Sequence, residues 1–247
     1  MAEIIGNTLI KLEKVDSTNN YATVHMSINN WKEGTVVLTD EQIRGRGQMN
    51  NSWESEPGAN LLMSIVLYPE FLPVHYQFLL SKVVTVGLCE MLARFVDEAK
   101  IKWPNDLYIG RKKVAGILIE NAVLGSTLSS SVIGIGLNIN QLEFNGGAPN
   151  PVSLRMLLNR KLDLEEIQSE VFEAIDKWYL KLRSGDLREI DTRFEELLYR
   201  KDELASYKDK AGVYRGVIKG VNEIGQLLIQ PETGNLRCYH FKEVEFI

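Results

Sequence analysis

The spacing of apolar residues changes at about residue 200, and this change limits the folds available to the chain. Before it, β-like runs such as 60–68 (NLLMSIVLY) alternate with helical patterns such as 74–95. After it, only short β-like runs remain, separated by turns rich in Gly and Asn. The pattern predicts an α+β fold, with a mixed β-sheet backed by helices over 1–197 and a small β-barrel over 198–247.

Individual elements follow from the same periodicity. A helix is expected over 15–26, because its segment DSTNN contains residue types that cap helix N-termini. The runs 106–109 and 114–120 flank a Gly-Arg-Lys-Lys turn and predict a hairpin. The remaining predictions are strands over 34–39, 60–68, 101–103 and 131–140, helices over 74–95, 164–182 and 187–199, and barrel strands over 213–218, 226–230, 237–241 and 244–246.

The net charge and the scarce cysteines and histidines argue against several classes of protein. The net charge is -5, whereas duplex-binding proteins carry a basic excess, so we expect no DNA partner. Cys89 and Cys238 form no CxxC pair, and the three histidines fit no metal motif, so no zinc site held by the protein is predicted. The chain shows neither a signal-peptide pattern nor an apolar run of roughly 20 residues, the length of a membrane span. We therefore expect a cytoplasmic protein without membrane contact.

A glycine-rich loop at 41–53 (EQIRGRGQMNNSW) is the first candidate for a binding site. Gly45 and Gly47 free the backbone to approach a ligand, and their N–H groups can surround an anion. Arg46 between them offers planar hydrogen bonding to a carboxylate or phosphate. Since the loop has little apolar surface to bury, we expect it to be mobile without ligand and ordered with it. A solvated turn would have the same composition.

The segment Lys102-Trp103-Pro104-Asn105-Asp106 is the second candidate. Proline fixes its own φ and restricts the preceding residue, so the segment predicts a corner that places Asn105 and Asp106 at a strand end. Asp106 could supply oxygen to a magnesium ion that arrives with a nucleotide, without a protein cage around the metal. Lys113 lies across the turn and could reach the same pocket. The alternative is that Lys113 belongs to a solvated trio of cations.

The third candidate is the strand-like segment 134–140 (GIGLNIN). Alternation along a strand puts its two glycines on one face with Asn138 and Asn140, and the glycines leave room for a flat group. Asn138 could bind a heterocycle or a ribose. The chain has neither GxGxxG nor a P-loop, so no dinucleotide fold or P-loop site is predicted. A close-packed core strand is the alternative.

The order of these motifs, DSTN, GRG…W, KWPND…K…GILIE and GIGLNIN, resembles the biotin protein ligase family. The resemblance runs from Asp16 to the C-terminus. It implies a catalytic sheet domain like that of class II synthetases, followed by an SH3-like barrel. It begins directly at the catalytic domain, so we expect no N-terminal DNA-binding domain. The implied reaction activates biotin with ATP and Mg²⁺ to biotinyl-5′-AMP and transfers biotin to a lysine of a biotin carboxyl carrier protein or domain. The resemblance leaves a homodimer open.

The resemblance also implies roles for individual residues. The residues expected at biotin are Ser17, Thr18, Asn19, Gln42, Gly45, Arg46, Gly47, Gln48, Lys113 and Gly116. Those expected at ATP are Arg46, Trp53, Asn105, Asp106, Lys113 and Asn138. Lys113 and Arg46 are the candidate catalytic cations, because the reaction brings a carboxylate and a phosphate together.

The glycine-rich loop departs from the family at three positions. Gln48 and Asn51 replace basic residues, and Asn50 replaces a glycine. Fewer charges near the phosphates leave the retention of the adenylate undetermined. Two other functions stay open from the sequence: a lipoate–protein ligase, and a sensor that binds biotinyl-AMP without transferring it.

The register of the strand that follows the Gly-Arg-Lys-Lys turn determines which face of the sheet Lys113 occupies. Side chains alternate across a strand, so a regular strand would place Lys113 and Gly116 on opposite faces. The resemblance places both near biotin. We therefore expect Lys113 to lie at the edge of the turn, outside the regular pleat.

Overall fold

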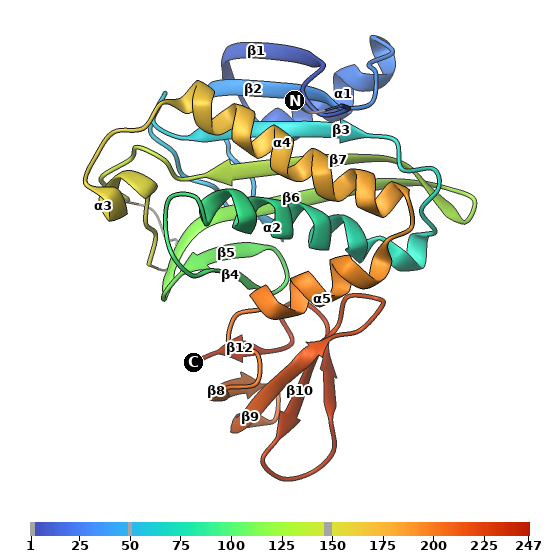
Figure 1. Cartoon of the computed structure of the whole chain (residues 1–247), viewed down its shortest axis with the longest axis vertical. Helices are drawn as coiled ribbons and strands as arrows, with labels where there is room; N and C mark the ends of the chain where they lie inside the picture. The colour runs from blue at the N-terminus through green and yellow to red at the C-terminus, as the bar shows by residue number, and fades with distance from the viewer. Residues whose placement is uncertain (1–2, 49–50, 146–149) are drawn as a thin grey trace.

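The computed structural model describes residues 3–48, 51–145 and 150–247. Its larger part is a seven-stranded mixed sheet in the order β1-β2-β3-β7-β6-β5-β4 (Figure 1). The pair β1·β2 is parallel, and the other neighbouring pairs are antiparallel. The strands are β1 (Thr8–Val15), β2 (Thr35–Gln42), β3 (Leu61–Leu67), β4 (Ala99–Lys102), β5 (Asp106–Ile109), β6 (Lys112–Leu124) and β7 (Thr127–Leu137). This arrangement confirms the predicted mixed sheet.

Helices cover both faces of this sheet, and the two apolar layers are separate. Figure 1 shows α2 (Phe78–Leu92) and α4 (Leu164–Arg183) crossing one face, with α5 (Leu187–Leu197) following them. The opposite face carries α1 (Thr18–Ile28), whose Ala22 packs with Val37, Val66 and Val132. Since neighbouring residues such as Val36 and Ile65 belong to the other core, strand alternation assigns each apolar residue to one layer.

Several element boundaries differ from the prediction. The expected helix over 74–95 divides into a 3-10 turn at Val74–Tyr76 and α2. The strands β6 and β7 form a hairpin that was not predicted: β6 extends beyond the predicted strand 114–120 at both ends, and β7 spans Thr127–Leu137 where a strand over 131–140 was expected. Three further elements were not predicted: β1, the short helix α3 (Leu154–Leu158) and β8.

The C-terminal part is a five-stranded antiparallel sheet in the order β11-β10-β9-β8-β12. Its strands are β8 (Leu204–Asp209), β9 (Gly212–Val221), β10 (Leu227–Pro231), β11 (Arg237–Tyr239) and β12 (Glu245–Phe246). The small SH3-like β unit predicted for this region is therefore present. Its buried residues, such as Tyr207 and Ile229, belong to the same continuous core as those of α2 and α4. The boundary at 197/198 stays a prediction.

A buried carboxylate fastens the start of the chain to α4. Asp176 is 2% exposed and accepts hydrogen bonds from the backbone N–H groups of Glu3, Ile4 and Ile5 at 2.6, 3.0 and 2.8 Å. Three donors satisfy a charge that would otherwise be costly to bury.

In the part of the chain that the structure describes, no helix is long and apolar enough to cross a membrane.

We expect Asp176→Asn to lower the free energy of unfolding by roughly 2–3 kcal/mol, because the amide replaces one charged acceptor with a donor facing N–H groups. Denaturant titration at neutral pH measures this change. Glu166→Gln, at an exposed position in the first turn of α4, is the control and should cost less than about 1 kcal/mol. Equal small effects would mean that the three hydrogen bonds contribute little to stability.

Candidate active site

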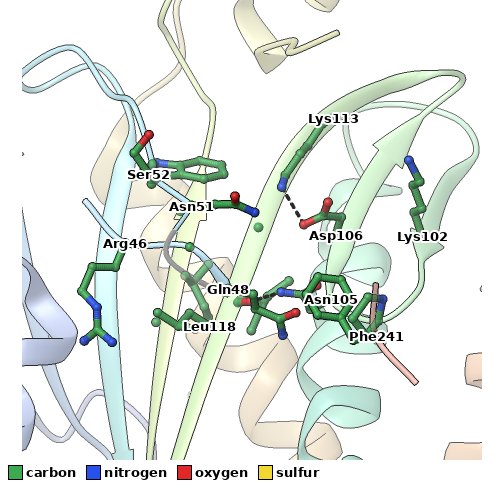
Figure 2. A pocket seen from close by; sticks show the side chains of 18 of the residues that line it. Arg46, Gln48, Asn51, Ser52, Lys102, Asn105, Asp106, Lys113, Leu118 and Phe241 are labelled. Carbon is green, nitrogen blue, oxygen red and sulfur yellow. Dashed lines mark hydrogen bonds and ion pairs between the residues drawn. The ribbon is translucent and has the colours of Figure 1, made fainter. Parts of the chain in front are cut away.

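One cavity of about 560 Å³ brings together segments from nearly the whole chain. Its wall comes from the start of α1, the glycine-rich loop, the β4–β5–β6 hairpin region, the glycines of β7 and the C-terminal residues 241–246 (Figure 2). A cavity of this size matches those that enclose small organic ligands. The predicted residues that line it are Ser17, Thr18, Asn19, Gln42, Arg46, Gly47, Gln48, Trp53, Asn105, Asp106, Lys113 and Gly116.

One end of the cavity is a network of polar side chains that ends at the Glu120 carboxylate. The Thr18 N–H donates to Gln42 Oε1 at 2.8 Å. Ser64 Oγ donates to Asn19 Oδ1 at 2.6 Å and lies 2.8 Å from Thr18 Oγ1, and Asn19 Nδ2 donates to Glu120 Oε2 at 2.9 Å. Such a network fixes donors and acceptors in place and suits a small polar ring. Ser64 lies in an apolar run, so no sequence signal pointed to it.

The glycines of the central strands make room for the indole of Trp53. A Cβ atom on Gly116 would come within 2.9 Å of the Trp53 ring, and one on Gly136 would overlap that ring. A Cβ on Gly134 would overlap Asn19. The flat group that the glycine face accommodates is therefore a side chain of the protein itself. This packing places the end of the glycine-rich loop against β6 and β7.

The position of Lys113 results from a β-bulge. Pairing of β5 with β6 shifts register between Leu107 and Tyr108, so that Tyr108 faces Lys113 while Leu107 faces Ala115. Val114 is the extra residue, and it restores Lys113 to the side of Gly116. Lys113 Nζ would lie 3.3 Å from a Cβ on Gly116. The expectation that Lys113 stands outside the regular pleat is confirmed.

Lys113 is held between a carboxylate and an aromatic ring. Its Nζ lies 2.6 Å from Asp106 Oδ1 and 5.6 Å from the centroid of the Trp53 ring. Figure 2 shows the two charged side chains pointing toward each other. Their exposed fractions are 20% and 25%, so both remain reachable from the cavity. The ammonium is therefore positioned to meet an anionic ligand.

Arg46 has a different environment. Its guanidinium lies 2.6 Å from Glu120 Oε1 and donates to Asn20 Oδ1 at 2.5 Å. In Figure 2 its side chain extends away from Lys113. The structure does not bring the two candidate cations together, so a catalytic role for Arg46 stays a prediction.

Three other predicted residues have mainly structural contacts. Asn105 is buried, and its Nδ2 donates to the Ile117 carbonyl, which ties the corner to β6. Gly45 and Asn138 do not line the cavity. Asn138 Nδ2 donates to Val152 O at 3.2 Å, whereas its buried Oδ1 has no hydrogen-bond partner among the described residues. Asn50, where the loop departs from the family, lies outside the described residues.

Two buried polar atoms in the cavity wall are unsatisfied. Trp53 Nε1 and Gln48 Oε1 have no hydrogen-bond partner in the part of the chain that the structure describes. Buried polar groups are satisfied in most proteins, so such atoms in a cavity mark places where a ligand or water completes the bonding. Trp53 Nε1 is a hydrogen-bond donor, and Gln48 Oε1 is an acceptor.

The cavity also contains residues that the sequence reasoning missed. Lys102 lies at the end of β4, where burial lowers its pKa and the Asp106 carboxylate partly opposes that effect. Burial raises the pKa of the neighbouring Tyr108 to about 12. Phe241, Lys242, Val244, Glu245 and Phe246 of the C-terminal unit complete the wall. Only the motif KWPND contained a signal for Lys102, and the C-terminal residues carried none.

The carboxylates of the site are too few to enclose a metal ion. Over 3–48, 51–145 and 150–247, no group of three or more His, Cys, Asp or Glu side chains is arranged to hold one. Magnesium that arrives with phosphates needs only one or two carboxylates from the protein. Asp106 is placed to supply one.

We expect Gly136→Ala to displace the Trp53 indole, because the new methyl group would occupy its space. The backbone N–H of Trp53, which donates to Gly45 O at 2.9 Å, should then exchange its hydrogen with solvent about tenfold faster or more. Gly47→Ala is the control, since its Cβ would have only an ordinary contact with Asn51 at 3.4 Å. Unchanged exchange at Trp53 in Gly136→Ala would contradict the packing described here.

Comparisons with known proteins agree with this geometry. The model of the Biotin/lipoate A/B protein ligase family matches residues 12–138. The chain is 28% identical to the bifunctional ligase/repressor BirA of Bacillus subtilis over 248 residues, which cover 96% of this chain and 74% of that protein. It is 28% identical to the biotin–[acetyl-CoA-carboxylase] ligase of Paracoccus denitrificans, covering 90% and 94% of the two chains.

Solved structures give the same result for the fold. The biotin protein ligase of Aquifex aeolicus in complex with biotin and ATP superposes with a TM-score of 0.78 at 26% identity, over 97% of this chain and 98% of that one. The sequence match to the family covers half of the chain, and the structural match extends through the C-terminal unit. The chain therefore belongs to the biotin/lipoate A/B protein ligase family.

Proposed function

We propose that this protein is an ATP-dependent biotin protein ligase, which forms biotinyl-5′-AMP and transfers biotin to a lysine of a biotin carboxyl carrier protein or domain. The observation that carries the proposal is that Lys113, held between Asp106 and the Trp53 indole, lines the same cavity as the polar network of Thr18, Asn19 and Gln42. Relatives along most of the chain are named biotin ligases, and an Aquifex relative has been solved with biotin and ATP. These names favour biotin over lipoate as the substrate.

The polar end of the cavity would bind the ring of biotin. Thr18, Asn19 and Gln42 supply fixed donors and acceptors there. The carboxylate of biotin would then extend toward Lys113. In the first step, a carboxylate oxygen attacks the α-phosphorus of ATP, the bond to the bridging oxygen breaks, and pyrophosphate leaves with the electron pair.

The task of Lys113 follows from charge. Two anionic groups must approach each other, and a positioned ammonium offsets their repulsion, the more strongly where bound substrates displace water. Asp106, 2.6 Å from Lys113 Nζ, holds the side chain of Lys113 in place before the substrates arrive. Magnesium that accompanies ATP would neutralise phosphate charge, with Asp106 as the protein carboxylate available to hold it.

The second step requires that biotinyl-AMP, the product of the first step, be protected from water. Biotinyl-AMP is a mixed anhydride that water hydrolyses, so a covering loop preserves it. The described residues of the glycine-rich loop from Arg46 to Trp53 line the cavity, and the loop would supply this cover. The acceptor amine then attacks the acyl carbon and AMP leaves. We place the reaction in the cytoplasm, where the free thiols of Cys89 and Cys238 would remain reduced.

The direct test combines the purified protein with ATP, magnesium, labelled biotin and a biotin carboxyl carrier domain. We expect biotin-dependent release of pyrophosphate and label on one carrier lysine, and no label on a carrier that lacks that lysine. Lipoate in place of biotin should give neither signal. Release without transfer would identify a sensor, and the absence of biotin-dependent release would refute ligase activity.

We expect Lys113→Ala to reduce the rate of adenylate formation roughly 100-fold or more, the scale for losing a positioned charge at a transition state. Lys112→Ala is the matched control, since Lys112 is the exposed neighbour on the same turn and does not line the cavity. Pyrophosphate release measures both rates, and thermal unfolding checks that both variants are folded. Equal small losses would reduce Lys113 to one of several solvated cations.

A further inference from the structure

Lys102 is a cavity residue that the reaction described above does not use. Its Nζ lies 4.7 Å from the centroid of the Tyr108 ring and 5.2 Å from that of Phe246, and it donates to Tyr108 Oη at 3.2 Å. Tyr108 belongs to β5, whereas Phe246 belongs to the last strand of the C-terminal unit. Two rings from different parts of the fold therefore fix the position of one ammonium group.

The charge of Lys102 is not matched by a close anion. Lys113 lies against Asp106, and Arg46 lies against Glu120. None of the ion pairs between the described residues involves Lys102, and the carboxylates of Asp106 and Glu245 lie against Lys113 and Lys208 instead. Burial lowers the pKa of Lys102, and Asp106 opposes this effect only in part. A desolvated cation in the wall of a cavity gains most when an anionic ligand approaches it.

The place of Lys102 relative to the biotin end of the cavity indicates which anion this is. Arg46 contacts Asn20 of α1, beside the polar network, and Figure 2 shows Arg46 and Lys102 on opposite sides of the pair Lys113–Asp106. In phosphoryl and nucleotidyl transfer, the attacking and leaving oxygens lie roughly in line. If biotin attacks from the side of the polar network, the leaving group departs toward Lys102.

We propose that Lys102 binds the β- and γ-phosphates of ATP and holds pyrophosphate as it leaves. The proposal rests on the proposed function, and it assigns the C-terminal unit a part in the first step, because Phe246 fixes the ammonium. The attack forms the bond between a biotin oxygen and the α-phosphorus and breaks the bond to the bridging oxygen. The electron pair remains on pyrophosphate, where Lys102 offsets the negative charge.

Measuring adenylate formation and transfer to the carrier separately distinguishes phosphate binding by Lys102 from a structural role. Lys102→Met keeps the stem that packs on Tyr108 and removes the charge. We expect it to raise the KM for ATP, and the KM for pyrophosphate in the reverse reaction, about tenfold or more, the scale of a hydrogen bond to a charged group. The KM for biotin should not change. Transfer from supplied biotinyl-AMP to a carrier domain should also be unchanged, since pyrophosphate takes no part in that step.

Two further variants complete the test. Lys102→Arg should recover part of the loss, and Lys112→Met, at an exposed lysine outside the cavity wall, should behave like wild type. Equal losses in both half-reactions of Lys102→Met, or an unchanged KM for pyrophosphate, would overturn the proposal.

Direct binding of inorganic pyrophosphate, measured by calorimetry with magnesium present, separates this proposal from the function itself. Wild type should bind pyrophosphate at least tenfold more tightly than Lys102→Met, whichever acid the enzyme activates. If wild type binds pyrophosphate through Lys102 but releases none from ATP with biotin, the biotin assignment fails and the phosphate site stands. Equal binding by the two proteins would refute the site.

Discussion

The ion pair of Lys113 and Asp106 is the contact around which the cavity is arranged. Its 2.6 Å separation depends on the bulge at Val114, because a regular strand would point Lys113 to the other face. A half-buried pair of this kind contributes little net stability, since desolvation offsets the attraction. The effect of the pair is to orient the ammonium of Lys113 before any substrate is bound, so that less reorganisation is needed during the reaction.

The C-terminal unit is connected to this pair through the corner that precedes Asp106. Trp103 Nε1 donates to Gly225 O at 2.9 Å, and the Trp103 ring meets Phe241 edge-on at 6.2 Å. Phe246 holds Lys102 from the same side. The cavity is therefore complete only when both parts of the chain are folded against each other. Because one continuous core lies beneath both parts, we expect them to unfold as one cooperative unit.

The sequence predicted those features that depend on neighbouring residues. Buried strands such as β3 are continuous apolar runs, and the motif residues of the hairpin line one cavity as expected. The edge strand β1 was missed because it alternates exposed and partly buried residues without a strong apolar run. The residues of the C-terminal unit in the wall were missed because nothing near them in sequence indicates a site whose other residues lie between Ser17 and Gly136. The partner of Arg46 was missed for the same reason, since Glu120 is 74 residues away.

The arrangement of charges explains how the loop can depart from its relatives and still serve the site. Gln48 and Asn51 are neutral, Arg46 is paired with Glu120, and Arg44 does not line the cavity, so the loop presents little free positive charge to a phosphate there. The hairpin and its surroundings carry that charge instead, on Lys113 and Lys102. These two lysines stand on rigid strands, where the position of an ammonium costs no ordering of a loop. The proposed task of the loop is then the other requirement of the chemistry, the exclusion of water, and the packing of Trp53 against Gly116 and Gly136 fastens one end of the loop for it.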